Sequence, residues 1–163
     1  VAYWDDGPDS FMVWEHGRTV ALDEFKPIDF QAGDGLVAWT DVTMKLIVYQ
    51  HGVPSRVLDH RPTQYWVRDS VVVFVDQGMF WTVEKGKAQV VENYVPEQWT
   101  VHEGRITYLD LNRSIRSWHH GERDDVSRGH AAIEKYEAFG DALLFRDPQG
   151  LNKVAWRGRV FDY

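Results

Sequence analysis

Short runs of apolar residues, separated by polar residues and glycines, recur along the whole chain. One group of four such runs covers Leu36–Thr40, Leu46–Gln50, Ser55–Leu58 and Gln64–Arg68. Val, Ile, Leu, Trp and Tyr dominate these runs, and residues of these types favour strands. No stretch of useful length has the apolar spacing of an amphipathic helix. The pattern therefore predicts an all-β protein built from short strands.

A repeat of about 35 residues organises these strands. Once per repeat an Asp closes an apolar strand, with a large side chain two positions before it. The Asp residues are Asp6, Asp41, Asp76, Asp110 and Asp147, and the large residues are Trp4, Trp39, Phe74, Tyr108 and Phe145. Pro27, Pro62, Pro96 and, in the fourth place, Ile133 form a second column, followed three positions later by Phe30, Tyr65, Trp99 and Tyr136. Columns that stay in phase indicate tandem structural repeats.

A glycine column marks two-residue hairpin turns in the same register. Its dipeptides are His16-Gly17, His51-Gly52, Lys85-Gly86, His120-Gly121 and Arg157-Gly158. Gly suits the second position because such turns require a positive φ. A second set of tight turns is predicted at Asp34-Gly35, Asp69-Ser70, Glu103-Gly104 and Gly140-Asp141. Each repeat is thus expected to form a four-stranded antiparallel sheet.

A sheet of this size cannot bury both of its faces alone, whereas a radial stack of such sheets buries them and protects the strand edges. With its columns of aromatic residues, Asp, Gly and Pro, the chain resembles the short-repeat β-propellers over its whole length. The resemblance implies an all-β fold, a β-propeller of four-stranded antiparallel blades. It does not extend to a functional family, so no site residues follow from it.

The register of the repeat predicts one β-propeller domain over residues 1–163. Whole blades are expected at 28–58, 63–91, 97–126 and 134–163, and a partial blade without its inner strand at 1–22. The object is therefore expected to be an incomplete five-bladed ring or half of a larger ring completed by a second chain. An unclosed propeller edge is expected to favour self-association, because unpaired strand edges recruit other strands.

Composition narrows the range of partners. The formal net charge of −7 argues against nucleic acid and against anionic membrane as partners, since phosphates require a basic surface. The chain has no cysteine, which excludes disulfides and thiolate metal sites. No apolar run is long enough to span a membrane. Phosphate-loop and dinucleotide-binding motifs are absent, so no cofactor is predicted.

The Asp column and the histidines are the first candidates for chemistry. The Asp residues could line a site for a cation or an amine, but Asp commonly caps its own turn, and a residue repeated in every blade favours that structural interpretation. His119 and His120 are adjacent, so on a strand they would face opposite ways. Because zinc requires three or four converging ligands, no metal site is predicted.

Departures from the repeat indicate a candidate ligand site. Trp66 stands where other repeats have Gln31, Thr100 and Glu137. Four polar residues, His60, Arg61, Arg128 and His130, lie in the long links between repeats. A shallow pocket made of Trp66 and these groups could stack a sugar ring or hold a peptide side chain. The alternative interpretation is irregular core packing for the Trp and solvated loops for the others.

The function that these patterns favour is a non-enzymatic binding or scaffold module, because a rigid repeated frame with variable loops suits recognition. A lectin-like carbohydrate-binding propeller is the first alternative, and a carbohydrate or a peptide is the expected ligand class. A hydrolase with a carboxylate site at the propeller rim is the second alternative, since carboxylate pairs are not readable from spacing. No catalytic residue is assigned.

Overall fold

The computed structural model describes residues 1–163, and strands are the only extended regular structure that they form. Nineteen strands form five antiparallel sheets, one with three strands and four with four. This confirms the predicted fold class. The chain divides into two compact units, residues 1–94 and 95–163. No helix in the structure is long and apolar enough to cross a lipid bilayer.

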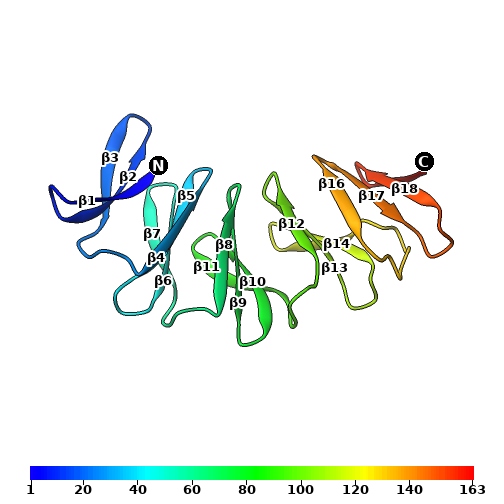
Figure 1. The fold of residues 1–163 in the computed structure, drawn as a ribbon, viewed down its shortest axis with the longest axis horizontal. Coiled ribbons are helices and arrows are strands. Elements are labelled where there is room, and N and C mark those ends of the chain that lie inside the picture. Colours follow the sequence, from blue (N-terminus) through cyan, green and yellow to red (C-terminus); the bar gives the residue numbers. More distant parts are fainter. The chain divides into compact units, whose positions relative to one another are not determined.

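The first unit contains three sheets, which follow one another in chain order (Figure 1). The three-stranded sheet consists of β1 (Ala2–Asp5), β2 (Ser10–Glu15) and β3 (Arg18–Asp23). The second sheet consists of β4 (Asp29–Gly33), β5 (Leu36–Thr40), β6 (Leu46–Gln50) and β7 (Val53–Leu58). The third consists of β8 (Gln64–Arg68), β9 (Val71–Asp76), β10 (Met79–Glu84) and β11 (Lys87–Glu92).

The second unit contains the remaining two sheets. One consists of β12 (Trp99–His102), β13 (Arg105–Leu109), β14 (Ile115–His119) and β15 (Glu122–Asp125). The other consists of β16 (Tyr136–Phe139), β17 (Ala142–Arg146), β18 (Asn152–Trp156) and β19 (Arg159–Asp162). All neighbouring strands within a sheet are consecutive in sequence, so every sheet is a simple meander.

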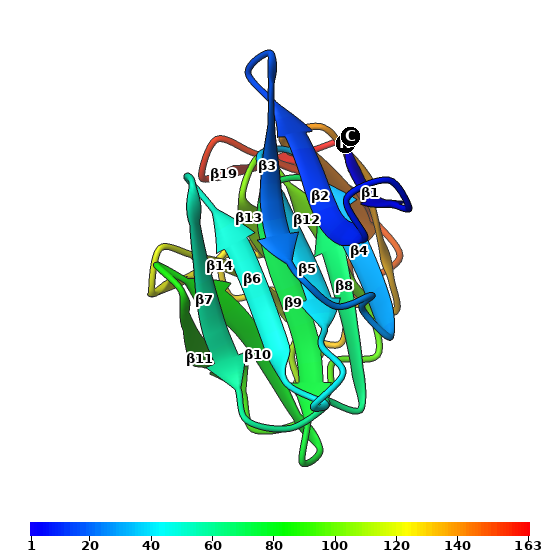
Figure 2. The same ribbon diagram turned by 90° about the vertical axis from the view of Figure 1, so that its left-hand side faces the viewer.

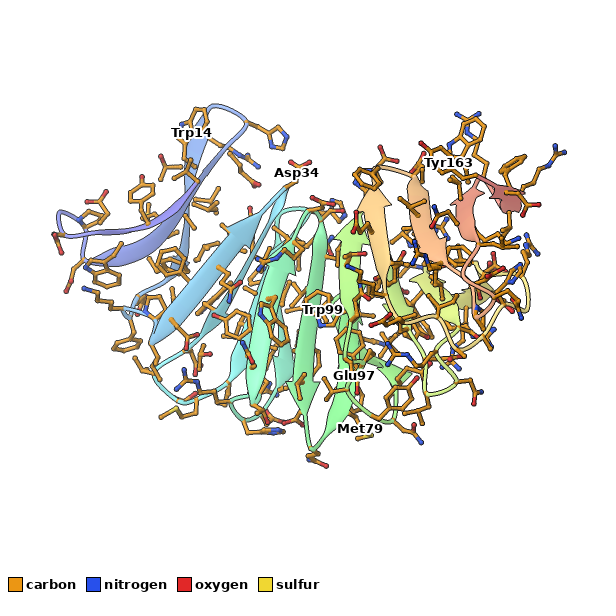
Figure 3. All side chains as sticks on the ribbon, turned by 45° about the vertical axis from the view of Figure 1, so that its right-hand side comes forward. Trp14, Asp34, Met79, Glu97, Trp99 and Tyr163 are labelled. Atoms are coloured by element: carbon orange, nitrogen blue, oxygen red, sulfur yellow. The ribbon has the colours of Figure 1, made fainter.

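The predicted hairpin turns are confirmed by their backbone angles. In the five dipeptides of the glycine column, the first residue has a φ of 46–53° and the Gly a φ of 72–82°. Positive φ at both positions defines the type I′ turn, whose twist matches that of antiparallel strands. Each turn of the second set also has at least one residue with positive φ. Asp34 and Met79 mark opposite ends of the sheets in the first unit (Figure 3).

The two aromatic columns form cross-strand pairs. The residue that follows each Pro by three positions lies opposite the large residue that precedes each Asp. The pairs are Phe30 with Trp39, Tyr65 with Phe74, Trp99 with Tyr108, and Tyr136 with Phe145. Trp39, Phe74 and Tyr108 are almost completely buried. The equivalent register of these pairs shows that the sequence columns mark equivalent places in the sheets.

Strand β5 shows how the sheets depend on one another. All five of its residues are buried, yet alternate residues enter different cores. Val37 and Trp39 pack with Phe11 of the three-stranded sheet. Leu36 and Ala38 pack in the other core, which includes Phe74 of the third sheet. Because side chains alternate across a strand, the middle sheet of this unit supplies one wall to each of two cores.

The sheets also approach one another at both edges of the first unit, where β4 lies beside β8 and β7 beside β11 (Figure 2). Gln31 on β4 joins the first of these edges: its Nε2 donates to the Tyr65 carbonyl at 2.8 Å, and its Oε1 accepts from Val67 N at 3.0 Å. At the other edge Gly86, in the β10–β11 turn, lies against Ser55 of β7. A Cβ on Gly86 would lie 2.7 Å from the Ser55 Cβ, whereas one on Gly52 would meet nothing within 4 Å.

These two glycines predict a measurable difference in stability. Both have positive φ, so replacement by Ala costs about 1–2 kcal/mol of backbone strain at each position. Gly86→Ala should destabilise the protein by more than Gly52→Ala, because it also forces β7 and β11 apart. Urea unfolding of both variants measures the difference, and Ser55→Gly added to Gly86→Ala should remove most of it. Equal losses in the two single variants would contradict close packing at this edge.

Candidate functional site

The Asp column is structural at three of its positions. Asp41 Oδ1 accepts from Thr43 N and Lys45 N, both at 2.8 Å. Asp110 and Asp147 cap their own five-residue loops in the same way, accepting from the amides two and four positions later. These contacts confirm the turn-capping interpretation, since a carboxylate already surrounded by amide donors is satisfied without a ligand.

In the second unit the free oxygen of each capping Asp meets a cation from the next strand. Arg116 Nε lies 2.8 Å from Asp110 Oδ2, and its Nη1 lies 3.5 Å from Asp125. Lys153 occupies the equivalent place in the next repeat and pairs with both Asp147 and Asp162. The repeated arrangement of a carboxylate, a cation and a second carboxylate holds three strands of each sheet together at one end.

Asp76 departs from the column because its hairpin is short. Met79 pairs directly with Asp76, so only Gln77 and Gly78 form the β9–β10 turn and no loop amides are left to cap. Its carboxylate instead accepts from His60, whose Nε2 lies 3.0 Å from both oxygens. Gln77-Gly78 belongs to neither of the two turn columns of the repeat and was not predicted, although its φ values are positive like those of the other hairpins.

The residues of the predicted ligand site are distributed over both units. Arg61 and Trp66 line one cavity of about 240 Å³ in the first unit. Arg61 Nη2 there lies 2.5 Å from Asp29 Oδ2, and the Tyr65 hydroxyl donates to Asp29 Oδ1 at 2.6 Å. Burial raises the pKa of Tyr65, and the hydrogen bond to Asp29 raises it further. His60 is not among the residues that line this cavity.

Arg128 and His130 belong to the second unit, in the long link before β16. Arg128 Nε donates to the Gly158 carbonyl at 3.0 Å, and the His130 ring lies edge-on to Phe145 with 5.9 Å between ring centroids. The structure thus brings Arg61 and Trp66 to one cavity. His60, Arg128 and His130 lie elsewhere, where each contacts another residue of the protein. A ligand role for these five residues stays a prediction.

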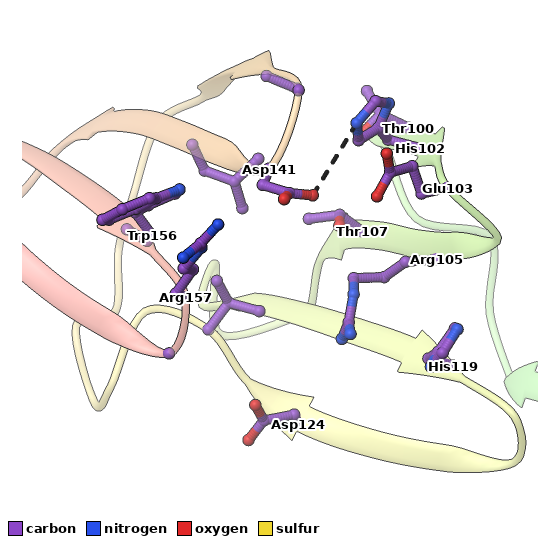
Figure 4. A pocket seen from close by; sticks show the side chains of 16 residues that line it. Thr100, His102, Glu103, Arg105, Thr107, His119, Asp124, Asp141, Trp156 and Arg157 are labelled. Carbon is purple, nitrogen blue, oxygen red and sulfur yellow. Dashed lines mark ion pairs between the residues drawn. The ribbon is translucent and has the colours of Figure 1, made fainter.

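A larger cavity, of about 470 Å³, lies between the two sheets of the second unit (Figure 4). Such a volume falls within the range of small-molecule sites. Its charged and aromatic lining is His102, Glu103, Arg105, His119, Asp124, Asp141, Trp156 and Arg157. These residues were not predicted to form a site, although Glu103 and Asp141 lie in the equivalent tight turns that the repeat predicts.

Arginines reach the cavity from both sheets. Arg105, on β13, donates to the Ser117 hydroxyl at 3.2 Å. Arg157, in the β18–β19 turn, places its guanidinium 4.6 Å from the ring centroid of Trp156. The Trp156 side chain is nevertheless 44% exposed. This Trp stands one position later in its strand than Trp118 does in the previous repeat, and a shift of one residue turns a side chain to the opposite face of a sheet.

A buried tyrosine joins the two sheets beside this cavity. The Tyr136 hydroxyl, on β16, donates to the Thr107 carbonyl at 2.7 Å and lies 3.1 Å from the Thr100 hydroxyl. Burial raises the pKa of Tyr136 to about 12, although the hydrogen bond with Thr100 acts in the opposite direction. Gln98 adds two contacts, because its side-chain amide donates to the Tyr136 carbonyl and accepts from its N–H. The two walls of the cavity are therefore fixed to each other.

His119 and His120 differ from the prediction. Their rings lie in contact, with centroids 4.0 Å apart, instead of facing opposite ways. The reason is that His120 is not a strand residue: it occupies the β14–β15 turn with a φ of 51°. The alternation rule applies only where the backbone is extended.

Stacked meanders of antiparallel strands, with aromatic cross-strand pairs at equivalent places in successive sheets, are the architecture of a β-propeller. The chain belongs to the 10-bladed beta propeller domain family, which it matches over residues 1–161. Its five sheets are half the number of blades in the family's description. No curated protein matches the chain.

Several solved structures are similar at low sequence identity. Hsv2 of Kluyveromyces lactis has a TM-score of 0.46 and 11% identity, over 96% of this chain and 58% of that one. Prp20p of Saccharomyces cerevisiae, described as binding Gsp1p and histones, has a TM-score of 0.44 and 12% identity, over 80% and 44%. The computationally designed protein Ika8 has a TM-score of 0.41 and 15% identity, over 96% and 56%. The chain spans about half the length of these structures.

The capping carboxylates predict how stability depends on pH. Partial burial tends to raise the pKa of Asp110, but the hydrogen bonds from Arg116, Ser114 and Asn112 outweigh it, so the pKa lies below its usual value. A carboxyl group with a lowered pKa in the folded state stabilises the protein above its unfolded value of about 4, and this stabilisation is lost as the pH falls through the folded pKa.

We expect Asp110→Asn to reduce the free energy of unfolding by about 1–2 kcal/mol at pH 7, because it removes a charged hydrogen-bond partner. The difference from the unmodified protein should shrink as the pH falls below about 4. Urea unfolding at a series of pH values measures both effects, with Asp9→Asn as an exposed control. A constant difference at all pH values would show that the Asp110 charge contributes nothing.

Proposed function

We propose that the protein is a non-enzymatic binding module whose ligand occupies the cavity between sheets β12–β15 and β16–β19. The observation that carries this proposal is the mixed charge of that cavity. Arg105 and Arg157 face three carboxylates, those of Glu103, Asp124 and Asp141. A rigid cavity that offers both donors and acceptors suits a ligand that can do the same.

A neutral, hydroxyl-rich ligand fits this lining best. An anionic ligand would meet the three carboxylates, and a cationic ligand would meet the two arginines, whereas a hydroxyl both donates and accepts hydrogen bonds. Trp156 adds an exposed apolar surface beside the polar groups, as the apolar face of a sugar ring requires. These features favour a short saccharide as the ligand class and support the lectin-like alternative over a hydrolase.

Sugar titrations of the unmodified protein and of an Asp124 variant test this function. Titration of the isotope-labelled protein with neutral mono- and disaccharides should shift backbone NMR signals of the cavity lining for at least one sugar. Asp124→Asn should weaken that binding by about tenfold or more, since a hydrogen bond to a charged group contributes about 1.5–3 kcal/mol. Glu122→Gln, an equivalent change on the same strand outside the cavity, should leave it unchanged. Absence of cavity shifts with every sugar, or equal affinity in both variants, would refute the proposal.

We also infer that strand β1 pairs with a second copy of the chain. In this sheet β1 pairs only with β2, whereas the equivalent strands β5, β9, β13 and β17 each have two neighbours. Val1 and Trp14 exchange both of their backbone hydrogen bonds, so in this antiparallel pair the N–H groups of Ala2 and Trp4 point away from β2. An edge with outward donors is a template for another strand.

This self-association has a direct test. Ala2→Pro removes one outward N–H without removing a hydrogen bond to β2, so it should shift the chain from dimer toward monomer. Ala2→Val keeps the donor and should leave the dimer intact. Light scattering after gel filtration at several protein concentrations measures the mass of each form. A monomeric unmodified chain at all concentrations would contradict the inference.

A further inference from the structure

Three potential metal ligands converge at the rim of the larger cavity. His102 ends strand β12, Glu103 follows it in the β12–β13 turn, and Asp141 lies in the β16–β17 turn of the neighbouring sheet. One ligand atom from each residue lies within 4.8 Å of the other two. All three side chains are exposed, and Figure 4 shows Asp141 on one sheet opposite His102 and Glu103 on the other.

The spacing of these groups suits an intervening ion better than a direct contact. His102 Nε2 and Asp141 Oδ1 are 3.9 Å apart, which is too long for a hydrogen bond. Two ligand atoms bound to one Zn²⁺ at about 2.1 Å are roughly 3.0–3.4 Å apart, depending on the coordination angle. Exposed side chains can close the remaining difference by small rotations.

We propose that His102, Glu103 and Asp141 bind a divalent transition-metal ion, with Zn²⁺ as the best candidate. One imidazole and two carboxylates form a mixed nitrogen and oxygen donor set, which suits Zn²⁺, whereas Ca²⁺ and Mg²⁺ prefer oxygen ligands alone. The two carboxylates offset the charge of the ion. Three protein ligands leave at least one coordination position free, as in open zinc sites.

The free position gives the ion a role in the cavity. Because Thr100, Thr107 and Arg105 line the same space, a hydroxyl of a bound ligand could complete the coordination while its other groups contact these residues. In this respect the inference deepens the proposed function. Ion binding itself needs only the three side chains, so it can be measured without any sugar.

Calorimetric titration of the metal-free 163-residue chain with Zn²⁺ alone tests the site. We expect one ion per chain at this site, and His102→Gln and Asp141→Asn should each weaken its binding at least tenfold. His51→Gln, at an exposed hairpin histidine, and Asp34→Asn, at the tight turn equivalent to Glu103, should bind Zn²⁺ like the unmodified chain. NMR signals of the His102 ring should shift on Zn²⁺ addition, and circular dichroism verifies that the variants remain folded.

The outcomes separate this inference from the proposed function. Equal Zn²⁺ affinity in His102→Gln and the unmodified chain, or no Zn²⁺ binding at all, would overturn the metal site. Sugar binding that persists with a chelator would then leave the proposed function in place. Zn²⁺ binding without sugar binding would uphold the metal site and count against the proposed function.

Discussion

The structure depends on the burial of both faces of a thin sheet. Four short antiparallel strands carry apolar residues on each side, so one sheet alone in water would expose the apolar residues of both faces. In the first unit the middle sheet solves this by packing a neighbour against each face. β5 sends Trp39 to one core and Leu36 to the other. Phe30, opposite Trp39 on β4, lies at the rim of the first core, with its ring centroid 5.0 Å from that of Phe11. The repeat keeps a nearly constant length because each sheet must present a similar face to the next sheet.

Local and periodic constraints were predictable from the sequence. A positive φ in a two-residue turn requires few residue types, so the glycine column identified all five hairpins of that set. The aromatic columns predicted which residues lie equivalently, because burial on a stacked sheet repeats with the sheet. Turn capping by Asp41, Asp110 and Asp147 was predictable for the same reason, since it involves only amides two and four positions away.

Contacts that depend on the geometry of a particular turn, or on how two sheets face each other, were not predictable in this way. The short β9–β10 turn leaves Asp76 to accept from His60, and the positive φ of His120 places its ring against that of His119. The ligand site predicted from the sequence consisted of Trp66 and polar residues of the long links. In the structure, however, Arg61 forms an ion pair with Asp29, and Arg128 donates to a backbone carbonyl. The mixed-charge cavity instead arises from ordinary turn positions in two successive sheets. Such a convergence depends on how the sheets face each other, and that information is not contained in spacing along the chain.

The position of the middle sheet has a consequence for how the protein tolerates substitution. A change at Trp39 disturbs the packing of two sheets through a single side chain, whereas Trp14, on the outermost sheet of the same unit and 52% exposed, touches far less. Sequence drift should therefore be slower in the central strands than at the exposed strand positions of the outermost sheet. New recognition properties can then arise at those exposed positions while the interior that supports them stays the same.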